Sequence, residues 1–323
     1  MIKKILFVVA GGVGILLAGF AVFVGARQHL TYDSPYPEIS ASTDTAVVAR
    51  GRYLVRNLVN CSMCHGDPTR MEEASQGVDI PLSGGYRWDI PPGHFYARNI
   101  TPDSTTGIGN FSDGAIARAL RNGVGQDGRA LLPFMEVQGL SDEDLVAVVS
   151  YLRTQTPVHN PIPDHQYNVL GKVVKATVLA KPVGPKETPP KSTPHGATIE
   201  NGRYIVESVT LCWACHTQRN QATGALTGPR FGGATEFLEP SDPEHSWSPP
   251  NITGDPETGR LGKWSEDEFV DRFRLGRIYP KSPMPWQGFR SMSDDDLRAV
   301  YRYLKSVPPV HRDVGAPVVD IKK

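Results

Sequence analysis

The chain is short of net charge and of cysteine. Its 34 lysines and arginines are balanced by 34 aspartates and glutamates, so its formal net charge at pH 7 is zero. This balance excludes the strongly basic surface with which many proteins bind nucleic acid. Only four cysteines occur in 323 residues, and all four fall in two short motifs of the same pattern.

Proline and glycine, in contrast, are plentiful. The 28 prolines and 32 glycines exceed what a compact helical bundle needs, and they predict long, irregular connections between helices. The length is sufficient for two ordinary globular domains.

The N-terminus predicts a membrane segment over residues 1–27. After Lys3 and Lys4, an uncharged run extends from Ile5 to Ala26, and at ~1.5 Å per residue it would cross a bilayer core of roughly 30 Å. The apolar part of a cleaved signal is usually about 7–15 residues, so the length favours an uncleaved anchor, although the end of the run would also pass as a cleavage site. The lysines favour a cytoplasmic N-terminus. We therefore expect a single span of the bacterial inner membrane, with the rest of the chain in the periplasm.

A long internal repeat organises the remaining residues. "ARGRYLVRNLVNCSMCH" from Ala49 matches "ENGRYIVESVTLCWACH" from Glu200, and an "NIT" motif begins at both Asn99 and Asn251. "LSDEDL" and "MSDDDL" match near the end of each copy. The offset stays at about 150 residues, which indicates one duplicated domain. The expected organisation is a first domain at 42–156, a proline-rich linker at 157–196, a second domain at 197–312 and a tail at 313–323.

Helix signals recur in each copy and predict about three helices per domain. The first helix is expected from Thr45 to about Asn60 in one copy and from Thr198 to Leu211 in the other. The second and third helices are predicted by serine N-caps, and the second is expected to end at a glycine. The residues concerned are Ser112, Gly123 and Ser141 in the first copy, and Ser265, Gly276 and Ser293 in the second.

Two further features concern packing. Gly51 and Gly202 are expected to let the first helix cross closely over the last, near Tyr151 and Tyr303. A short amphipathic helix is expected within the linker, where it would dock on a domain; its apolar positions are Leu170, Val173, Val174, Thr177 and Val178.

Each copy contains the pattern C-x-x-C-H, namely Cys61, Cys64 and His65, then Cys212, Cys215 and His216. On a helical turn, residues i and i+3 share a face, so two thiols can bond the vinyl groups of one haem while the next histidine reaches the iron. The pattern is typical of covalent c-type haem attachment. A zinc site would require closer cysteine pairs, a redox dithiol would require a βαβ context, and disulfides would leave the histidines unexplained.

Methionines at matching places are the candidates for the sixth iron ligand. Met135 and Met284 each precede the last helix, and a thioether opposite histidine raises the reduction potential of haem. Met292 is a weaker rival to Met284. The predicted iron ligands are thus His65 with Met135 in the first copy and His216 with Met284 in the second.

Other residues recur around the expected haem pockets. Tyr96 and Trp247 occupy matching positions and could donate hydrogen bonds to haem propionates. Asn99 and Asn251 follow them closely and are also expected to contact the cofactor. His94 and His245 recur as well, and we interpret them as polar loop residues rather than ligands.

Both copies resemble class I cytochrome c domains. The resemblance rests on "CSMCH" and "CWACH", on the methionines before "SDEDL" and "SDDDL", and on the terminal "SYLRTQTPV" and "RYLKSVPPV". It implies an all-α protein of two tandem domains, each with three to four helices around a covalent haem c.

More narrowly, "NITPDSTTGIG" and "MPW" resemble the cytochrome c subunits of bacterial membrane-bound alcohol, gluconate and related sugar dehydrogenases. Those subunits carry three haem motifs and a cleaved signal, whereas this chain has two motifs and an anchor-like N-terminus. The resemblance implies periplasmic electron transfer within a respiratory or dehydrogenase complex. A membrane-bound or periplasmic oxidoreductase would be the donor, and an oxidase or another cytochrome the acceptor.

Three functions compete on the sequence. A dihaem electron carrier, which is not itself an enzyme, explains every repeated feature. A dihaem peroxidase would need one iron with an open sixth position, which the two methionines disfavour. A scaffold held by disulfides would leave the histidines without a role, and one held by zinc would require cysteine pairs closer together in the sequence.

Overall fold

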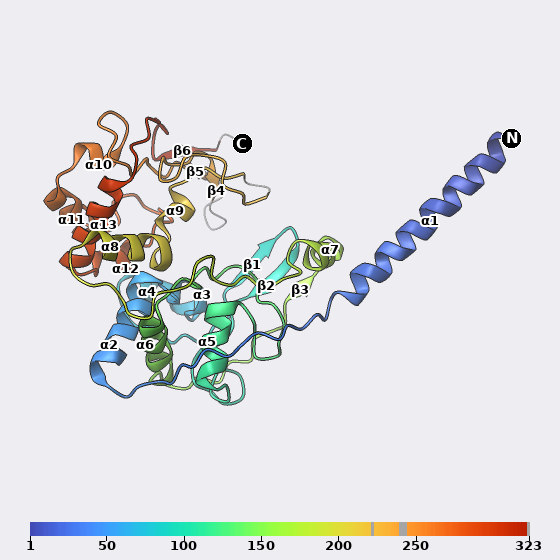
Figure 1. Cartoon of the computed structure of the whole chain (residues 1–323), viewed down its shortest axis with the longest axis horizontal. Coiled ribbons are helices and arrows are strands. Elements are labelled where there is room, and N and C mark those ends of the chain that lie inside the picture. The colour runs from blue at the N-terminus through green and yellow to red at the C-terminus, as the bar shows by residue number, and fades with distance from the viewer. Residues whose placement is uncertain (221–222, 239–243, 322–323) are drawn as a thin grey trace.

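The computed structural model describes residues 1–220, 223–238 and 244–321. Figure 1 shows a long N-terminal helix that projects away from two helical bodies, one built before the linker and one after it. We call residues 42–156 the first half and residues 197–312 the second half.

Helix α1 (Ile2–Ala26) is long and apolar enough to cross a membrane, and none of its residues is buried against the rest of the chain. The segment that follows runs along the first half. Within it Ile39 is buried, and the ring of Tyr36 lies 4.1 Å from the guanidinium of Arg118. The segment that follows α1 is therefore held against the first half by packing.

The two halves share a common order of elements: a first helix continued by a π-helical segment, a short cysteine helix, two strands and two longer helices, with different short helices added in each half. The first half contains, in order, α2 (Thr45–Tyr53), a π-helical segment (Leu54–Leu58), α3 (Ser62–His65), a 3-10 turn (Pro68–Arg70), α4 (Met71–Ser75), β1 (Arg87–Ile90), β2 (Gly93–Tyr96), α5 (Asp113–Asn122) and α6 (Asp142–Arg153). The second half contains α8 (Ile199–Tyr204), a π-helical segment (Ile205–Val209), α9 (Cys212–Cys215), β4 (Phe237–Leu238), β5 (His245–Trp247), α10 (Arg260–Lys263), α11 (Glu266–Arg274), α12 (Trp286–Arg290) and α13 (Asp294–Ser306). Between the halves lie β3 (Gln166–Tyr167) and α7 (Val169–Thr177), and β6 (Val318–Asp320) follows the second half.

The helix boundaries confirm the predicted caps. The side chains of Ser112, Ser141 and Ser293 each accept a hydrogen bond from the first turn of their helix, and Ser265 forms a full capping box with Glu268. The glycines expected to end α5 and α11, Gly123 and Gly276, both have positive φ angles, of 62° and 67°. These are conformations that glycine adopts without strain.

The close helix crossing in each half also confirms a prediction. A Cβ added at Gly51 would lie 1.9 Å from the carbonyl oxygen of Ala147 in α6, and one added at Gly202 would lie 1.9 Å from that of Ala299 in α13. Only glycine allows α2 to approach α6, and α8 to approach α13, at this distance.

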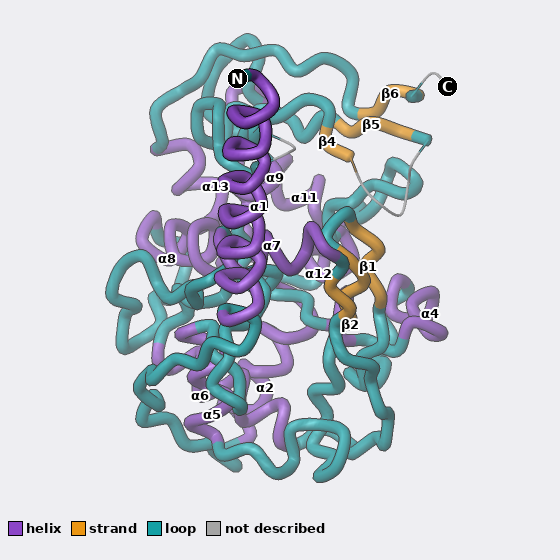
Figure 2. The backbone as a smooth tube through the Cα atoms, turned by 90° about the vertical axis from the view of Figure 1, so that its right-hand side faces the viewer, coloured by secondary structure: helices purple, strands orange, loops and turns teal. Residues whose placement is uncertain are grey.

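The all-α class is not confirmed, because the described residues also form two three-stranded antiparallel sheets, β1-β2-β3 and β4-β5-β6. Figure 2 shows them as two separate groups of strands. The strands have two to four residues, too few for a clear alternating pattern in the sequence. In each sheet the third strand comes from beyond residue 156 or 312, so the repeated contacts continue past the ends predicted for the domains.

The two halves also hold each other through a pair of matching tyrosines. The hydroxyl of Tyr204, at the end of α8, donates to Asp144 (2.7 Å) and accepts from the backbone N–H of Ser141, at the start of α6. The hydroxyl of Tyr53, at the end of α2, makes the same two contacts with the start of α13. We call this reciprocal contact the tyrosine clasp.

Candidate haem sites

Both C-x-x-C-H motifs lie on a single helical turn. In the first half the N–H of His65 donates to the carbonyl of Cys61 (2.8 Å), and in the second the N–H of His216 donates to that of Cys212 (2.9 Å). This turn places the two cysteines of each motif on one face and the histidine beside them. The geometry matches what covalent attachment of a haem requires.

A left-handed residue precedes each motif. Asn60 and Leu211 have φ angles of 54° and 52°, and each follows a π-helical segment. A left-handed conformation costs roughly 1–2 kcal/mol for a residue with a side chain, and irregular helical turns of this kind often occur at functional sites. In both halves, the π-helical segment and the left-handed residue end the first helix and turn the chain into the cysteine motif.

The histidines are oriented identically. His65 Nδ1 lies 2.7 Å from the carbonyl oxygen of Arg98, and His216 Nδ1 lies 2.8 Å from that of Pro250. A carbonyl can only accept, so Nδ1 carries the proton and Nε2 keeps the lone pair that binds a metal. Burial lowers the pKa of both histidines, which keeps the imidazoles neutral, as an iron ligand must be.

The first cysteine of each motif is not poised as a redox thiol. Burial raises the pKa of Cys61 to about 12 and that of Cys212 to about 11. Reactive dithiols have lowered pKa values because the thiolate is the nucleophile. Among the described residues, moreover, no group of three histidine, cysteine, aspartate or glutamate side chains could hold a metal ion. The redox and zinc interpretations therefore gain no support.

The predicted methionine ligands lie against the core of their halves. Met135 and Met284 are both half-buried and pack on the hydrophobic cluster. Met135 stands in a loop, where its carbonyl accepts a hydrogen bond from Gln138, whereas Met284 lies just before α12. Met292 is only 4% exposed and is part of the core. Iron ligation by Met135 and Met284 stays a prediction that this placement allows.

One buried polar atom lacks a partner where a haem propionate is expected. Trp247 is 5% exposed, and its Nε1 makes no hydrogen bond among the described residues. A buried donor left unsatisfied costs about 1–3 kcal/mol. A propionate carboxylate would satisfy it, so this pocket fits a haem. Tyr96 ends β2 as Trp247 ends β5, but Tyr96 is half-buried.

Asn99 and Asn251 have a role in the protein itself. Each amide donates to a carbonyl beyond the last helix, that of Val158 or Val310, and each side-chain oxygen accepts from a threonine two residues later. These bonds fix the loop whose preceding carbonyl orients the histidine. A direct contact with the cofactor stays a prediction.

His94 and His245 lie on strands, not in the loops in which the sequence analysis placed them. His94 on β2 pairs with Asp89, and His245 on β5 pairs with Asp320 at 3.4 Å.

Sequence reasoning missed the groups that orient the histidines, because they are backbone carbonyls of Arg98 and Pro250 and carry no side-chain signal. Their positions immediately before the two "NIT" motifs could have pointed to them. The buried Nε atoms of Arg118 and Arg219, which have no hydrogen-bond partner among the described residues, were also not foreseen.

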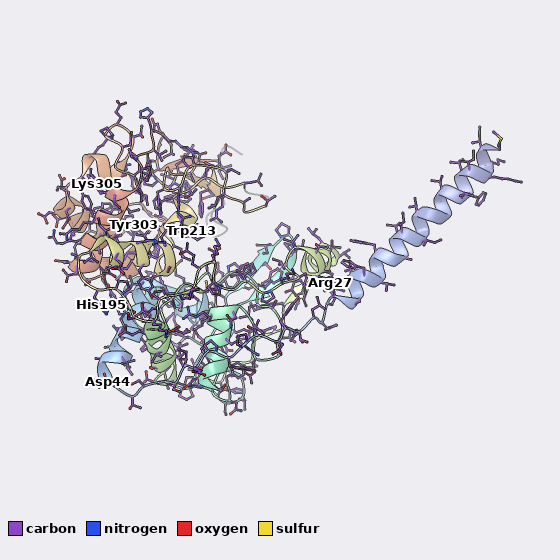
Figure 3. The ribbon with its side chains drawn as sticks, viewed as in Figure 1. Arg27, Asp44, His195, Trp213, Tyr303 and Lys305 are labelled. Carbon is purple, nitrogen blue, oxygen red and sulfur yellow. The ribbon has the colours of Figure 1, made fainter. Side chains whose placement is uncertain are left out.

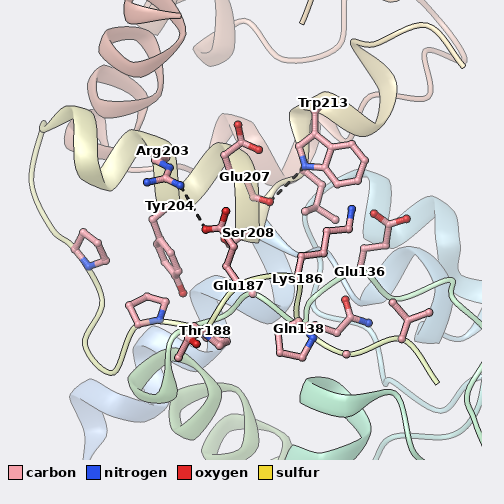
Figure 4. A pocket seen from close by; sticks show the side chains of 18 of the residues that line it. Glu136, Gln138, Lys186, Glu187, Thr188, Arg203, Tyr204, Glu207, Ser208 and Trp213 are labelled. Carbon is pink, nitrogen blue, oxygen red and sulfur yellow. Dashed lines mark hydrogen bonds and ion pairs between the residues drawn. The ribbon is translucent and has the colours of Figure 1, made fainter. Parts of the chain in front are cut away.

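A cleft of about 840 Å³ opens between the two halves. It is lined by the Met135 loop of the first half, by the linker, and by Trp213, which lies inside the second cysteine motif (Figure 4). Lys186 and Arg230 lie over the Trp213 ring, each 5.1 Å from its centre. The distal loop of one candidate site and the attachment motif of the other thus border the same cleft.

Comparisons with known proteins agree with this geometry. Residues 46–152 match the family described as cytochrome C oxidase, cbb3-type, subunit III. These residues are therefore similar to a cytochrome c domain.

Over most of its length the chain is similar to cytochrome subunits of dehydrogenases. It is 32% identical to the cytochrome c subunit of alcohol dehydrogenase (quinone) from Gluconacetobacter polyoxogenes, over 92% of this chain and 62% of that protein. It is 30% identical to the fructose dehydrogenase cytochrome subunit of Gluconobacter japonicus, over 91% and 57%. A diheme cytochrome c-type protein of Cereibacter sphaeroides is 27% identical over 77% and 82%. The chain thus spans about three fifths of the length of the dehydrogenase subunits.

Proposed function

We propose that the protein is a membrane-anchored, periplasmic dihaem cytochrome c that passes single electrons within a dehydrogenase or respiratory complex. The observation that carries this proposal is the duplication of one site. Each of the two C-x-x-C-H turns ends in a histidine whose Nδ1 is hydrogen-bonded to a backbone carbonyl. A membrane-bound or periplasmic oxidoreductase would donate the electrons, and an oxidase or another cytochrome would accept them.

The residues of each half have defined parts in this function. The cysteines would hold the haem by thioether bonds, His65 and His216 would bind iron through Nε2, and Met135 and Met284 would complete the coordination. When bound, haem supplies an iron that alternates between ferrous and ferric states. Ligation by both histidine and methionine would favour the ferrous state, and it would leave no position on the iron for a substrate. The protein therefore carries electrons and is not itself the enzyme.

The contact between the halves supports transfer from one site to the other. The tyrosine clasp fastens the first helix of each half to the last helix of its neighbour. Burial and the nearby Asp144 carboxylate raise the pKa of Tyr204, so its hydroxyl keeps the proton that it donates. An interface with such buried, directional bonds would hold two haems at a constant separation.

The relatives support the proposed partner. Two of them are named as cytochrome subunits of alcohol and fructose dehydrogenases. We infer that this chain also serves a dehydrogenase. Anchoring by α1 would confine it to the membrane plane and so shorten its search for donor and acceptor.

Haem content and redox titration of the purified protein test the proposal. We expect two covalent haems by mass, two reversible one-electron steps, and a far-red ferric band of two methionine-bound sites. One step with a high-spin signal and half of the far-red band would mean that one iron is open, and it would replace the carrier with a peroxidase-type enzyme. Protein without covalent haem would overturn both.

A second experiment addresses the anchor. Residues 1–26 are replaced by a cleavable secretion signal, and respiration and co-purification with the dehydrogenase are measured. We expect both to fall. Unchanged respiration and unchanged co-purification would show that anchoring is not needed.

A further inference from the structure

Helix α7 (Val169–Thr177) turns apolar side chains away from the protein. The sequence predicted an amphipathic helix docked on a domain by its apolar side. The helix exists, but Val169 is 81% exposed, Leu170 51% and Val178, its C-terminal neighbour, 78%. The small residues Gly171 and Ala176 are the ones that it buries. Val173 and Val174, in the middle of the same face, are half-buried, so the chain covers this apolar face only in part.

The same helix is fastened to the base of α1. Arg27 Nε donates to the carbonyl of Ala176 (2.7 Å), Gln28 donates to that of Lys172 (3.0 Å), and Lys175 Nζ donates to that of Gln28 (2.7 Å). Figure 1 shows α7 beside the end of α1, and Figure 3 places Arg27 at this junction. The position of α7 relative to α1 is thus set by bonds to the two residues that follow the apolar helix.

Basic residues occur on the side of α7 away from Leu170 and Val178. Lys172 and Lys181 are exposed, Lys175 is bound to Gln28, and no acidic residue occurs from Val169 to Lys181. A helix with one apolar face and lysines on the other side is suited to the boundary between lipid headgroups and acyl chains. Lysines near such a surface gain further from anionic lipids.

We propose that α7 lies on the bilayer surface, with Leu170 and Val178, which share one side of the helix, inserted among the lipids at the periplasmic end of α1. The proposal rests on the anchoring role of α1 that is part of the proposed function. The lipid surface is chosen over a protein partner because α7 adjoins α1, which among the described residues is the helix long and apolar enough to cross a membrane. Two contacts with the membrane, one across it and one along it, would fix the orientation of the first half above the bilayer.

Spin labels on the full chain in nanodiscs of phosphatidylethanolamine and phosphatidylglycerol test this inference. Single cysteines replace Val178 on α7, Leu16 on α1, or Leu275, an exposed apolar residue of the second half that serves as the matched control. The unsubstituted protein, whose own cysteines would be bonded to haem, should take up no label. Accessibility to oxygen reports lipid, and accessibility to a water-soluble nickel complex reports solvent.

We expect the labels at positions 178 and 16 to favour oxygen and the label at 275 to favour nickel. If position 16 reports lipid while 178 reports water, α1 is an anchor and the inference about α7 is wrong. If neither reports lipid, the anchor itself fails, and the inference fails with it. A haem spectrum equal to that of the unsubstituted protein shows that a labelled variant is folded. If Val178→Cys does not fold, Leu170→Cys repeats the test on the same face of α7.

Discussion

The first and second halves share the residues that hold the histidine and differ in those around the opposite side of the expected haem. In both, a glycine lets the first helix touch the last, a left-handed residue precedes the cysteines, and an asparagine loop fixes the carbonyl that orients the histidine. Both copies of the duplicated domain thus retain the backbone features that position the histidine as a metal ligand.

The methionine side has diverged. Met284 leads directly into α12, where Trp286 packs on Phe273, with their rings 5.6 Å apart, and lies 3.8 Å from the guanidinium of Arg272. Met135 stands in an irregular loop at the inter-half cleft, next to the exposed Phe134. Ferric haem carries one more positive charge than ferrous haem, so contact with water stabilises it and lowers the potential. We therefore expect the first half to hold the haem of lower potential.

Loss of a whole haem is the largest expected effect. Replacing Cys212 and Cys215 by serine should remove one covalent haem of two, and the same change at Cys61 and Cys64 should remove the other. Mass spectrometry and the haem absorbance per protein measure this. Met63→Leu, an exposed change inside the first motif, is the control and should keep both. A double-serine variant with unchanged haem content would contradict the assignment.

Replacing each methionine in turn should show which reduction potential belongs to the haem of which half. Met135→Ala and Met284→Ala should each lower one potential by on the order of 0.1 V, a fraction of the roughly 0.8 V that axial ligands span, and each should abolish half of the far-red ferric band. Redox titration then assigns the steps: the lower step should move in Met135→Ala and the higher one in Met284→Ala. The reverse assignment would show that solvent at the cleft does not determine the order. Met292→Leu, at the buried rival position, should move neither step.

Substitution of the glycine at the close helix crossing should destabilise both halves equally. Gly51→Ala and Gly202→Ala each place a Cβ within 1.9 Å of a helix carbonyl, and overpacking of this kind typically costs about 1–3 kcal/mol or more. Denaturant unfolding of the haem-loaded protein measures the loss. Gly184→Ala, where nothing lies within 4 Å of the added carbon, should have little effect. A loss confined to one half would mean that the two crossings are not equivalent.

The two tyrosines of the tyrosine clasp should contribute unequally to the free energy of unfolding. Asp144 is fully buried and also binds Arg50, whereas Asp296 is half-buried. Tyr204→Phe leaves a buried carboxylate and a backbone N–H short of a bond, and should cost about 1–3 kcal/mol in the free energy of unfolding. Tyr53→Phe should cost about 0.5–1.5 kcal/mol, because water can replace the hydroxyl. Equal costs would indicate that the two contacts are energetically alike.

The sequence predicted the parts of this structure that depend on local pattern. Serine caps, the glycine crossings and the cysteine turns follow from short-range rules, and the repeat supplied each of them twice. It did not predict the strands, which are short and pair with residues from beyond each expected domain. Nor could it foresee Leu211, a residue with no preference for the left-handed conformation, since only the surrounding fold imposes that angle.

Contacts between segments far apart in the chain also could not be predicted from the sequence. Tyr204 and Asp144 are separated by 60 residues and by the linker, so nothing local pairs them. The linker helix was predicted, but the direction of its apolar face was not, because the pattern shows that a face exists and does not show what covers it.

The smallest effects should come from the expected propionate partners, where the halves differ again. Trp247 presents a buried N–H that has no acceptor in the described part of the chain, whereas Tyr96 is half-buried and accessible to water. Trp247→Phe should shift the potential of the second haem, because a propionate that loses a buried donor becomes a less screened negative charge and stabilises the ferric state, which lowers the potential. Tyr96→Phe should shift the first potential less, since water can take the place of the hydroxyl. Redox titration measures both shifts, and the tryptophan N–H resonance of the reduced protein reports the bond directly. A shift in Tyr96→Phe larger than that in Trp247→Phe would reverse this order and place the more strongly held propionate in the first half.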